Sequence, residues 1–129
     1  MRNPNYTKTY EDLMVYQRAF KIAIALHQLS LNFPKIEQYV LADQIRRASK
    51  SICANIAEGY ARRLASAQEF KRFLSIAFGS TEEMRVWVSF AAELGYLPAE
   101  DAVNFANEYV EIGRMLRSLA RTSKKIIPK

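Results

Sequence analysis

The sequence contains very little of what most enzymes and metalloproteins need. It has one cysteine, Cys53, and one histidine, His27, among 129 residues. A single cysteine excludes an intramolecular disulfide and a cysteine-rich zinc site. The sequence also lacks a glycine-rich phosphate-binding loop and a nucleophile elbow. We therefore expect no catalytic residues, no bound metal and no cofactor, and we expect that the protein is not an enzyme.

Turn-forming residues are scarce as well. The chain has only four glycines and four prolines, which is fewer than an all-β fold or a compact α/β fold requires. Half of the residues are apolar and a quarter are charged, as in ordinary globular proteins. We expect one mainly helical domain over residues 1–129, with a short polar leader at about 1–9 and a basic tail at about 122–129.

Long apolar runs are also missing. The longest candidate, residues 22–31, is interrupted by His27 and Gln28, whereas a membrane-spanning helix needs about 20 apolar residues. The first residues have no apolar core of the kind that a signal peptide carries. We therefore expect a cytoplasmic protein that has no membrane partner.

Apolar residues recur every three or four positions along four segments, which is typical of amphipathic helices. The predicted helices cover residues 11–32, 36–61, 67–94 and 99–122. Thr9 and Ser66 are suitable N-caps, and Gly95 suits the left-handed residue that ends a helix. Because the connections are short, sequential helices should be antiparallel. The predicted fold class is all-α, an antiparallel up-down-up-down four-helix bundle.

The same spacing identifies the side of each predicted helix that should face the bundle core. These core positions include Phe20 in the first helix; Leu41, Ile45, Ile52 and Ile56 in the second; Phe70, Phe73, Leu74, Ala77, Phe78, Met84 and Val88 in the third; and Val103, Ala106, Val110, Gly113, Leu116 and Ala120 in the fourth.

The second predicted helix also has an organised polar face, about 100° around the helix from its apolar stripe. One interpretation is a solvated surface. The other is a seam packed against another helix or another subunit, in which polar residues set the register. A glycine within a helix destabilises it by about 1 kcal/mol relative to alanine. Gly59 therefore indicates either that another backbone approaches the helix closely at this position or that the helix ends nearby. The candidate seam comprises Gln44, Arg47, Ser51, Asn55, Glu58, Gly59 and Arg62.

Positive charge is concentrated in a few places. The chain has 19 lysines and arginines against 13 acids, a net charge of +6, which suits an anionic partner. In an up-down bundle, Arg62 and Arg63 would lie at the same end as the basic tail. The alternative is structural, because basic side chains also complement the dipole at a helix C-terminus. The candidate nucleic-acid-binding residues are Arg46, Arg47, Lys50, Arg62, Arg63, Arg114, Arg117, Arg121, Lys124 and Lys125.

Several short strings occur together in this chain. They include Phe33-Pro-Lys-Ile-Glu37, Gln44-Ile-Arg-Arg-Ala48, Asn55-Ile-Ala-Glu-Gly59, Gly79-Ser80 and Leu94-Gly-Tyr-Leu97. In this combination, the chain from about residue 10 to residue 121 resembles the 23S rRNA intervening-sequence protein family, which is also called the four-helix-bundle protein family.

The resemblance implies a bundle that assembles into a ring, typically a homopentamer, and a gene in or near inserted segments of large-subunit ribosomal RNA. Family members have no established enzymatic activity. A related branch serves as the accessory variability protein of diversity-generating retroelements, where a basic pentameric barrel contacts nucleic acid and the reverse transcriptase. We therefore expect a ring-forming protein that binds nucleic acid, RNA more than DNA, through repeated basic patches. The alternative is a protein-binding adaptor, such as an accessory subunit of a retroelement reverse transcriptase.

Overall fold

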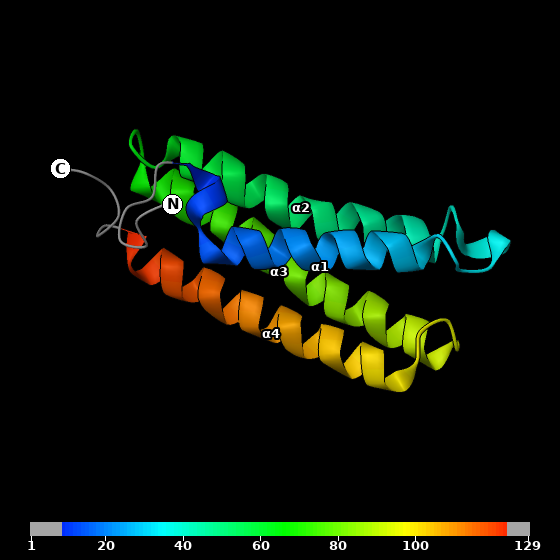
Figure 1. Cartoon of the computed structure of the whole chain (residues 1–129). Helices are drawn as coiled ribbons and strands as arrows, with labels where there is room; N and C mark the ends of the chain where they lie inside the picture. The colour runs from blue at the N-terminus through cyan, green and yellow to red at the C-terminus, as the bar shows by residue number, and fades with distance from the viewer. Residues whose placement is uncertain (1–8, 124–129) are drawn as a thin grey trace.

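The computed structural model describes residues 9–123, which form four long α-helices and two short 3₁₀ helices without a β-strand. In chain order the elements are η1 (Tyr10–Asp12), α1 (Met14–Ser30), η2 (Lys35–Glu37), α2 (Leu41–Arg62), α3 (Ala67–Glu93) and α4 (Ala99–Arg121). Each long helix runs opposite to the one before it (Figure 1). The predicted all-α four-helix bundle is therefore confirmed.

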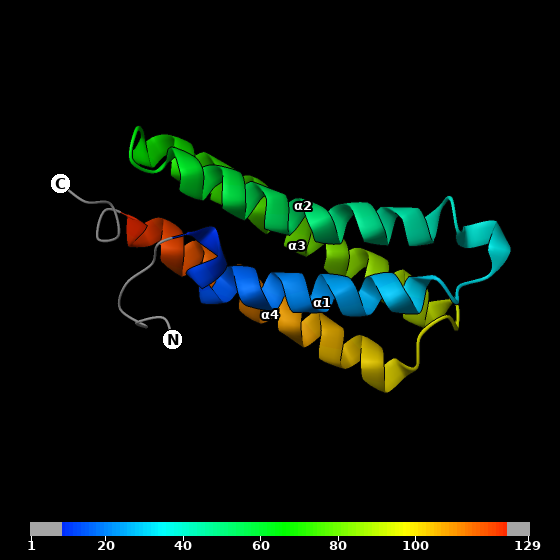
Figure 2. The same ribbon diagram turned by 45° about the horizontal axis from the view of Figure 1, so that its top comes forward.

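The four helices surround one core. Sequential helices are neighbours, and α4 lies beside α1, so that α2 and α4 take diagonal positions. As Figures 1 and 2 both show, α1 and α4 lie close together where α1 begins and α4 ends, and they diverge toward the other end. We call the end at which α1 begins and α4 ends the terminal end. Helix α2 also ends there, as predicted from the up-down arrangement.

The core contains the predicted apolar stripe of α2, because Leu41, Ile45, Ile52 and Ile56 are all buried. The predicted stripe of α3 is buried too, except for Phe78, which is half-buried. None of the helices within residues 9–123 has the length and the apolar character that crossing a membrane requires.

The predicted core positions of α4 were partly wrong. Val103 and Val110 are 58% and 49% exposed, whereas the fully buried side chains of this helix are Tyr109, Ile112 and Leu116. Phe20 of α1 was also predicted to be in the core and is 49% exposed. Both helices therefore carry apolar side chains outside the core as well as within it, and periodicity alone does not separate the two sets.

Both ends of α3 follow the sequence prediction. The Ser66 hydroxyl accepts a hydrogen bond from the Glu69 backbone N–H at 3.1 Å, which satisfies one of the free donors at the helix start. At the other end Gly95 has a φ of +80°, and the Tyr96 N–H donates to the Ala91 carbonyl at 2.8 Å. This is the backbone arrangement of a Schellman cap, which glycine adopts without steric cost.

The first two helices begin later than predicted. Thr9 caps the separate turn η1, and the extended backbone of Leu13 interrupts the chain before α1 begins at Met14. Helix α2 begins at Leu41, after an irregular backbone at Val40. Side chains satisfy carbonyl groups of the connection before α2. Gln38 Nε2 donates to the Ser30 and Phe33 carbonyls at 2.9 and 3.0 Å, and Arg46 donates to the Gln38 carbonyl at 2.6 Å.

Candidate functional site

Four arginines line one groove between α3 and α4, toward the terminal end of the bundle. Arg85 comes from α3, while Arg114, Arg117 and Arg121 lie three and four residues apart on one side of α4. We call this groove the arginine groove. It has a volume of about 530 Å³, and its lining residues are Phe78, Glu82, Arg85, Val110, Arg114, Arg117 and Arg121. With four guanidinium groups and a single carboxylate, the lining is strongly positive.

Arg117 packs against an aromatic ring in this groove. Its guanidinium carbon lies 4.3 Å from the centre of the Phe78 ring, close enough for a cation–π interaction. The ring can rest against α4 because Gly113 has no side chain. A Cβ atom at Gly113 would lie only 3.1 Å from Phe78 Cε1. Gly113, Phe78 and Arg117 thus form a stack that runs from the α4 backbone to the exposed Arg117 head group.

A second, smaller hollow meets the arginine groove at this stack. It has a volume of about 240 Å³ and is lined by Lys71 and Ser75 of α3 as well as by Phe78 and Arg117. Arg117 therefore lies between two hollows, and both of them contain basic side chains.

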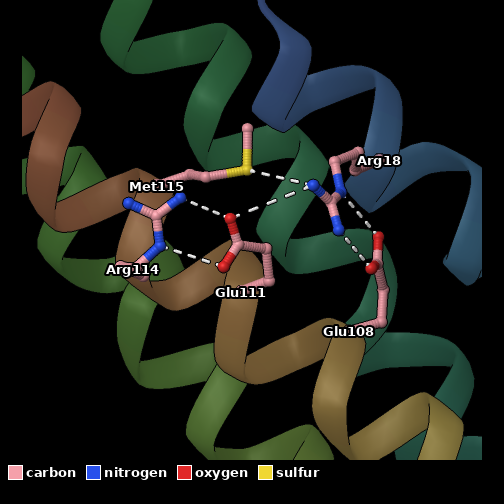
Figure 3. A network of polar contacts seen from close by, with 5 residues as sticks. All are labelled: Arg18, Glu108, Glu111, Arg114 and Met115. Atoms are coloured by element: carbon pink, nitrogen blue, oxygen red, sulfur yellow. Dashed lines mark hydrogen bonds and ion pairs between the residues drawn. The ribbon is translucent and has the colours of Figure 1, made fainter.

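Arg114 is held by a polar network that joins α4 to α1, drawn in Figure 3. Its Nε donates to Glu111 Oε2 at 2.9 Å, and a second N–H bonds the other oxygen of this carboxylate. Glu111 also lies 4.0 Å from Arg18. Arg18 donates to both oxygens of Glu108 at 2.9 and 2.5 Å, and it contacts Met115 Sδ at 3.8 Å.

This network changes the charge that Arg114 presents. The hydrogen bonds from Arg114 lower the pKa of Glu111, so this carboxylate stays ionised and offsets much of the positive charge of Arg114. Arg85 is offset in the same way by Glu82, which lies 3.1 Å from it. Within residues 9–123, Arg117 and Arg121 form no ion pair. These two side chains therefore carry most of the uncompensated charge of the groove.

The basic residues of α2 do not line this groove, because α2 lies diagonally across the bundle from α4. Arg46 donates to Ser30 Oγ at 2.9 Å and to the Gln38 carbonyl at 2.6 Å, and it thereby fixes the connection between α1 and α2. Arg63 donates to the Tyr60 carbonyl at 2.7 Å and lies over the Tyr60 ring. Both arginines thus donate hydrogen bonds within the chain, although the buried Nε of Arg63 has no hydrogen-bond partner within residues 9–123.

The other predicted basic residues take varied positions. Arg47 is exposed and pairs with Asp43 at 2.8 Å, and Lys50 is exposed. Arg62 lies 4.0 Å from Glu58, with its guanidinium 5.2 Å from the centre of the Phe73 ring. The candidate residues Lys124 and Lys125 lie outside the described residues.

The middle of the candidate seam packs against α3 of the same chain. The Ser80 hydroxyl donates to Ser51 Oγ at 3.1 Å, and Asn55 Nδ2 donates to the Ser51 carbonyl at 2.8 Å. Gly59 is buried, and a Cβ atom there would lie 2.8 Å from Phe73 Cβ. The remaining candidates, Gln44, Arg47, Glu58 and Arg62, are exposed. The interpretation as a packed seam thus applies to Ser51, Asn55 and Gly59, and the interpretation as a solvated surface applies to the other four residues.

The exposed apolar side chains of the bundle include two separate groups on the long helices. The α3/α4 patch lies beside the arginine groove, away from the terminal end, and consists of Val86, Phe90, Val103 and Val110. A groove of about 780 Å³ runs between its helices. The α1 patch consists of the exposed Phe20 and Ile24 together with the half-buried Tyr16, whose ring stacks on that of Phe20 with the ring centres 6.0 Å apart.

The two patches lie on different faces of the bundle. Arg18 points from α1 toward α4, as its contacts with Glu108 and Met115 require. Phe20 follows two residues later and is therefore about 200° around the same helix. The α1 patch thus faces away from α4 and is separate from the α3/α4 patch.

The arrangement is a four-helix bundle with an arginine-lined groove between α3 and α4. Among residues 9–123, no group of three or more His, Cys, Asp or Glu side chains is placed to hold a metal ion. The sequence model of the family described as "23S rRNA-intervening sequence protein" matches residues 11–118. The chain belongs to this family, as the sequence resemblance predicted.

A solved structure supports the assignment. The chain is similar to the crystal structure of a protein with unknown function from the S23 ribosomal protein family of Bacteroides thetaiotaomicron. The two are 26% identical and superpose with a TM-score of 0.74, over 84% of this chain and 96% of the other. None of the curated proteins compared matches the chain.

Proposed function

We propose that the protein is a non-enzymatic RNA-binding protein whose arginine groove contacts the phosphate backbone. The observation that carries this proposal is the exposed pair Arg117 and Arg121, which form no ion pair within the described residues and lie beside Arg85 and Arg114. Guanidinium groups match phosphate oxygens in geometry and in charge. The name of the family refers to 23S rRNA, which favours RNA over DNA. The single free thiol favours a cytoplasmic location.

One groove offers few phosphate contacts, so a single copy should bind weakly and the affinity should fall steeply with salt. Such contacts position a nucleic acid without reading its sequence. Several linked copies would bind much more tightly, because each further contact becomes intramolecular. The proposal therefore includes assembly of the chain into a homo-oligomer.

We propose that the copies assemble head to tail, with the α1 patch of one copy against the α3/α4 patch of the next. Two different patches make a heterologous contact, and such contacts generate closed rings when the rotation between copies closes. A homopentamer is the size that the family resemblance implied. Because cyclic symmetry rotates every copy about one axis, all of the arginine grooves would lie at the same level of the ring.

The test is fluorescence anisotropy with a labelled RNA oligonucleotide, titrated at several salt concentrations. We expect Arg117→Glu/Arg121→Glu to lower the affinity more than tenfold and to reduce the salt slope by about 1.4, the value for two lost contacts to a single strand. The matched control is Arg47→Glu/Lys50→Glu, which makes the same change of charge on exposed side chains of α2. It should change the affinity less than threefold.

Two outcomes would contradict the proposal. If both double variants weaken binding equally, total charge rather than the arginine groove attracts the RNA. If the wild-type protein binds no RNA at low salt, the adaptor alternative gains support. Its expected signature is a tight association with a protein partner, such as a reverse transcriptase, that salt hardly weakens.

A further inference from the structure

The stack of Gly113, Phe78 and Arg117 gives one side chain of the groove a property that the others lack. A guanidinium group is planar, and that of Arg117 has an aromatic ring on one side, 4.3 Å from the ring centre. Arg117 is nevertheless exposed, so it also offers a surface to solvent. The ring beneath is held in place because α4 leaves room for it at Gly113. The guanidinium of Arg117 is therefore a planar cation that rests on the Phe78 ring.

Such a plane suits an unpaired base. Bases that are released from a duplex stack on aromatic rings and on arginine planes, and proteins recognise single-stranded RNA in this way. A paired base has both of its faces covered by its neighbours, so a duplex offers this plane only phosphates and sugars. We propose that Arg117, supported by Phe78, stacks on an unpaired base, and that the arginine groove therefore prefers single-stranded nucleic acid over a duplex.

The surroundings of Arg117 fit a strand that passes over it. Arg121 and Arg85 lie in the hollow on one side, and Lys71 lies in the hollow on the other. A strand whose base rests on Arg117 has phosphates before and after that base, and both hollows offer basic side chains to receive them. The inference rests on the proposed RNA-binding function, and it adds the class of ligand and the residue that selects it.

The experiment compares three probes of equal length by fluorescence anisotropy. They are a single-stranded RNA, a single strand of abasic sugar-phosphate units, and an RNA duplex. The variant is Arg117→Lys, which keeps the charge but removes the plane. The matched comparison is Arg121→Lys, which makes the same change in the same groove at an arginine that lies over no aromatic ring of residues 9–123.

We expect Arg117→Lys to weaken binding of the single-stranded RNA about fivefold or more, as the loss of one stacked base would. It should change binding of the abasic strand and of the duplex less than twofold. Because Arg121 contacts phosphate in the proposed function, and all three probes carry phosphates, Arg121→Lys should weaken all three by the same factor. A second variant, Phe78→Leu, keeps an apolar side chain but removes the ring, and it should reproduce the selective loss.

The outcomes separate the two proposals. If the wild-type protein binds the single strand, the abasic strand and the duplex equally, and Arg117→Lys behaves like Arg121→Lys, then the stacking inference is wrong and the RNA-binding function stands. If the wild-type protein binds none of the three probes at low salt, both proposals fail.

Discussion

Gly59 and Gly79 allow the same substitution to be tested at a packed position and at an open position. In Gly59→Ala, the new Cβ atom would lie 2.8 Å from Phe73 Cβ and 3.3 Å from the Phe70 carbonyl oxygen. Neither neighbour is the end of a flexible side chain, so α2 and α3 must move apart. Such overpacking costs typically 1–3 kcal/mol, against a gain in helix propensity of about 1 kcal/mol. We expect the free energy of unfolding to fall by about 1 kcal/mol.

Gly79→Ala is the matched control. A Cβ atom at Gly79 would meet nothing within 4 Å, so only the gain in helix propensity remains. We expect the free energy of unfolding to rise by about 0.5–1 kcal/mol. The measurement is urea denaturation followed by circular dichroism, with all proteins at one concentration because assembly makes stability depend on concentration.

The comparison has a clear point of failure. If Gly59→Ala is stabilised as much as Gly79→Ala is, the close approach of α2 and α3 at this position is wrong. If Gly79→Ala is destabilised and also changes the mass in solution, another copy covers Gly79 in the assembly.

Three further predictions concern other parts of the bundle. Phe90→Glu and Phe20→Glu should each lower the mass measured by native mass spectrometry to that of smaller species, because each places a charge in one of the two patches that form the proposed ring contact. An unchanged mass would refute the head-to-tail ring. Arg18→Lys should lower the free energy of unfolding by up to about 1 kcal/mol, because lysine cannot make the bidentate contact with Glu108 at the partly exposed junction of α1 and α4. A double-mutant cycle with Glu108→Gln that gives no coupling energy would contradict this. Burial raises the pKa of Cys53 to about 11 from an ordinary value of 9.0. At pH 8, iodoacetamide should therefore alkylate the folded protein about 100-fold more slowly than the urea-unfolded protein, because the thiolate is the form that reacts. Equal rates would show that the Cys53 thiol of the folded protein is accessible and ionised.

The sequence predicted the helices and their antiparallel order because both depend on local spacing and on short connections. It placed the start of α2 too early for a reason that is not local. Arg46 is 16 residues from Ser30 and eight from Gln38, yet its hydrogen bonds fix the connection that precedes α2. A window of one or two helical turns cannot contain such a contact.

The fourth helix shows a second reason why the sequence alone misplaced residues of the core. Val103 and Val110 recur with helical spacing, and the spacing was taken to mean a core stripe, yet both are exposed. Periodicity reports that a side is apolar. It does not report whether that side meets the core of its own bundle or the surface of another molecule, because both environments select the same residues.

The candidate site was predicted in part. The arginines of α4 were identified because they cluster in sequence without intervening acids. Arg85 and Phe78 were missed as site residues, since they belong to α3 and reach the groove only when α3 packs against α4. The spacing of Gly113 and Arg117, one helical turn apart, was the available signal, but its meaning depends on the ring that occupies the space.

The position of Arg121 at the end of α4 determines where a fluorescent reporter can be attached without blocking the arginine groove. Helix α4 ends at the terminal end (Figure 1), and its last residue is Arg121, so a fluorescent domain fused near residue 123 would crowd Arg121 and mask the binding that it is meant to report. The connection between α1 and α2 lies at the opposite end, roughly 30 Å away along a helix of 22 residues. A small dye attached through a cysteine introduced at Ile36, which is 81% exposed, would leave the arginines open to ligand.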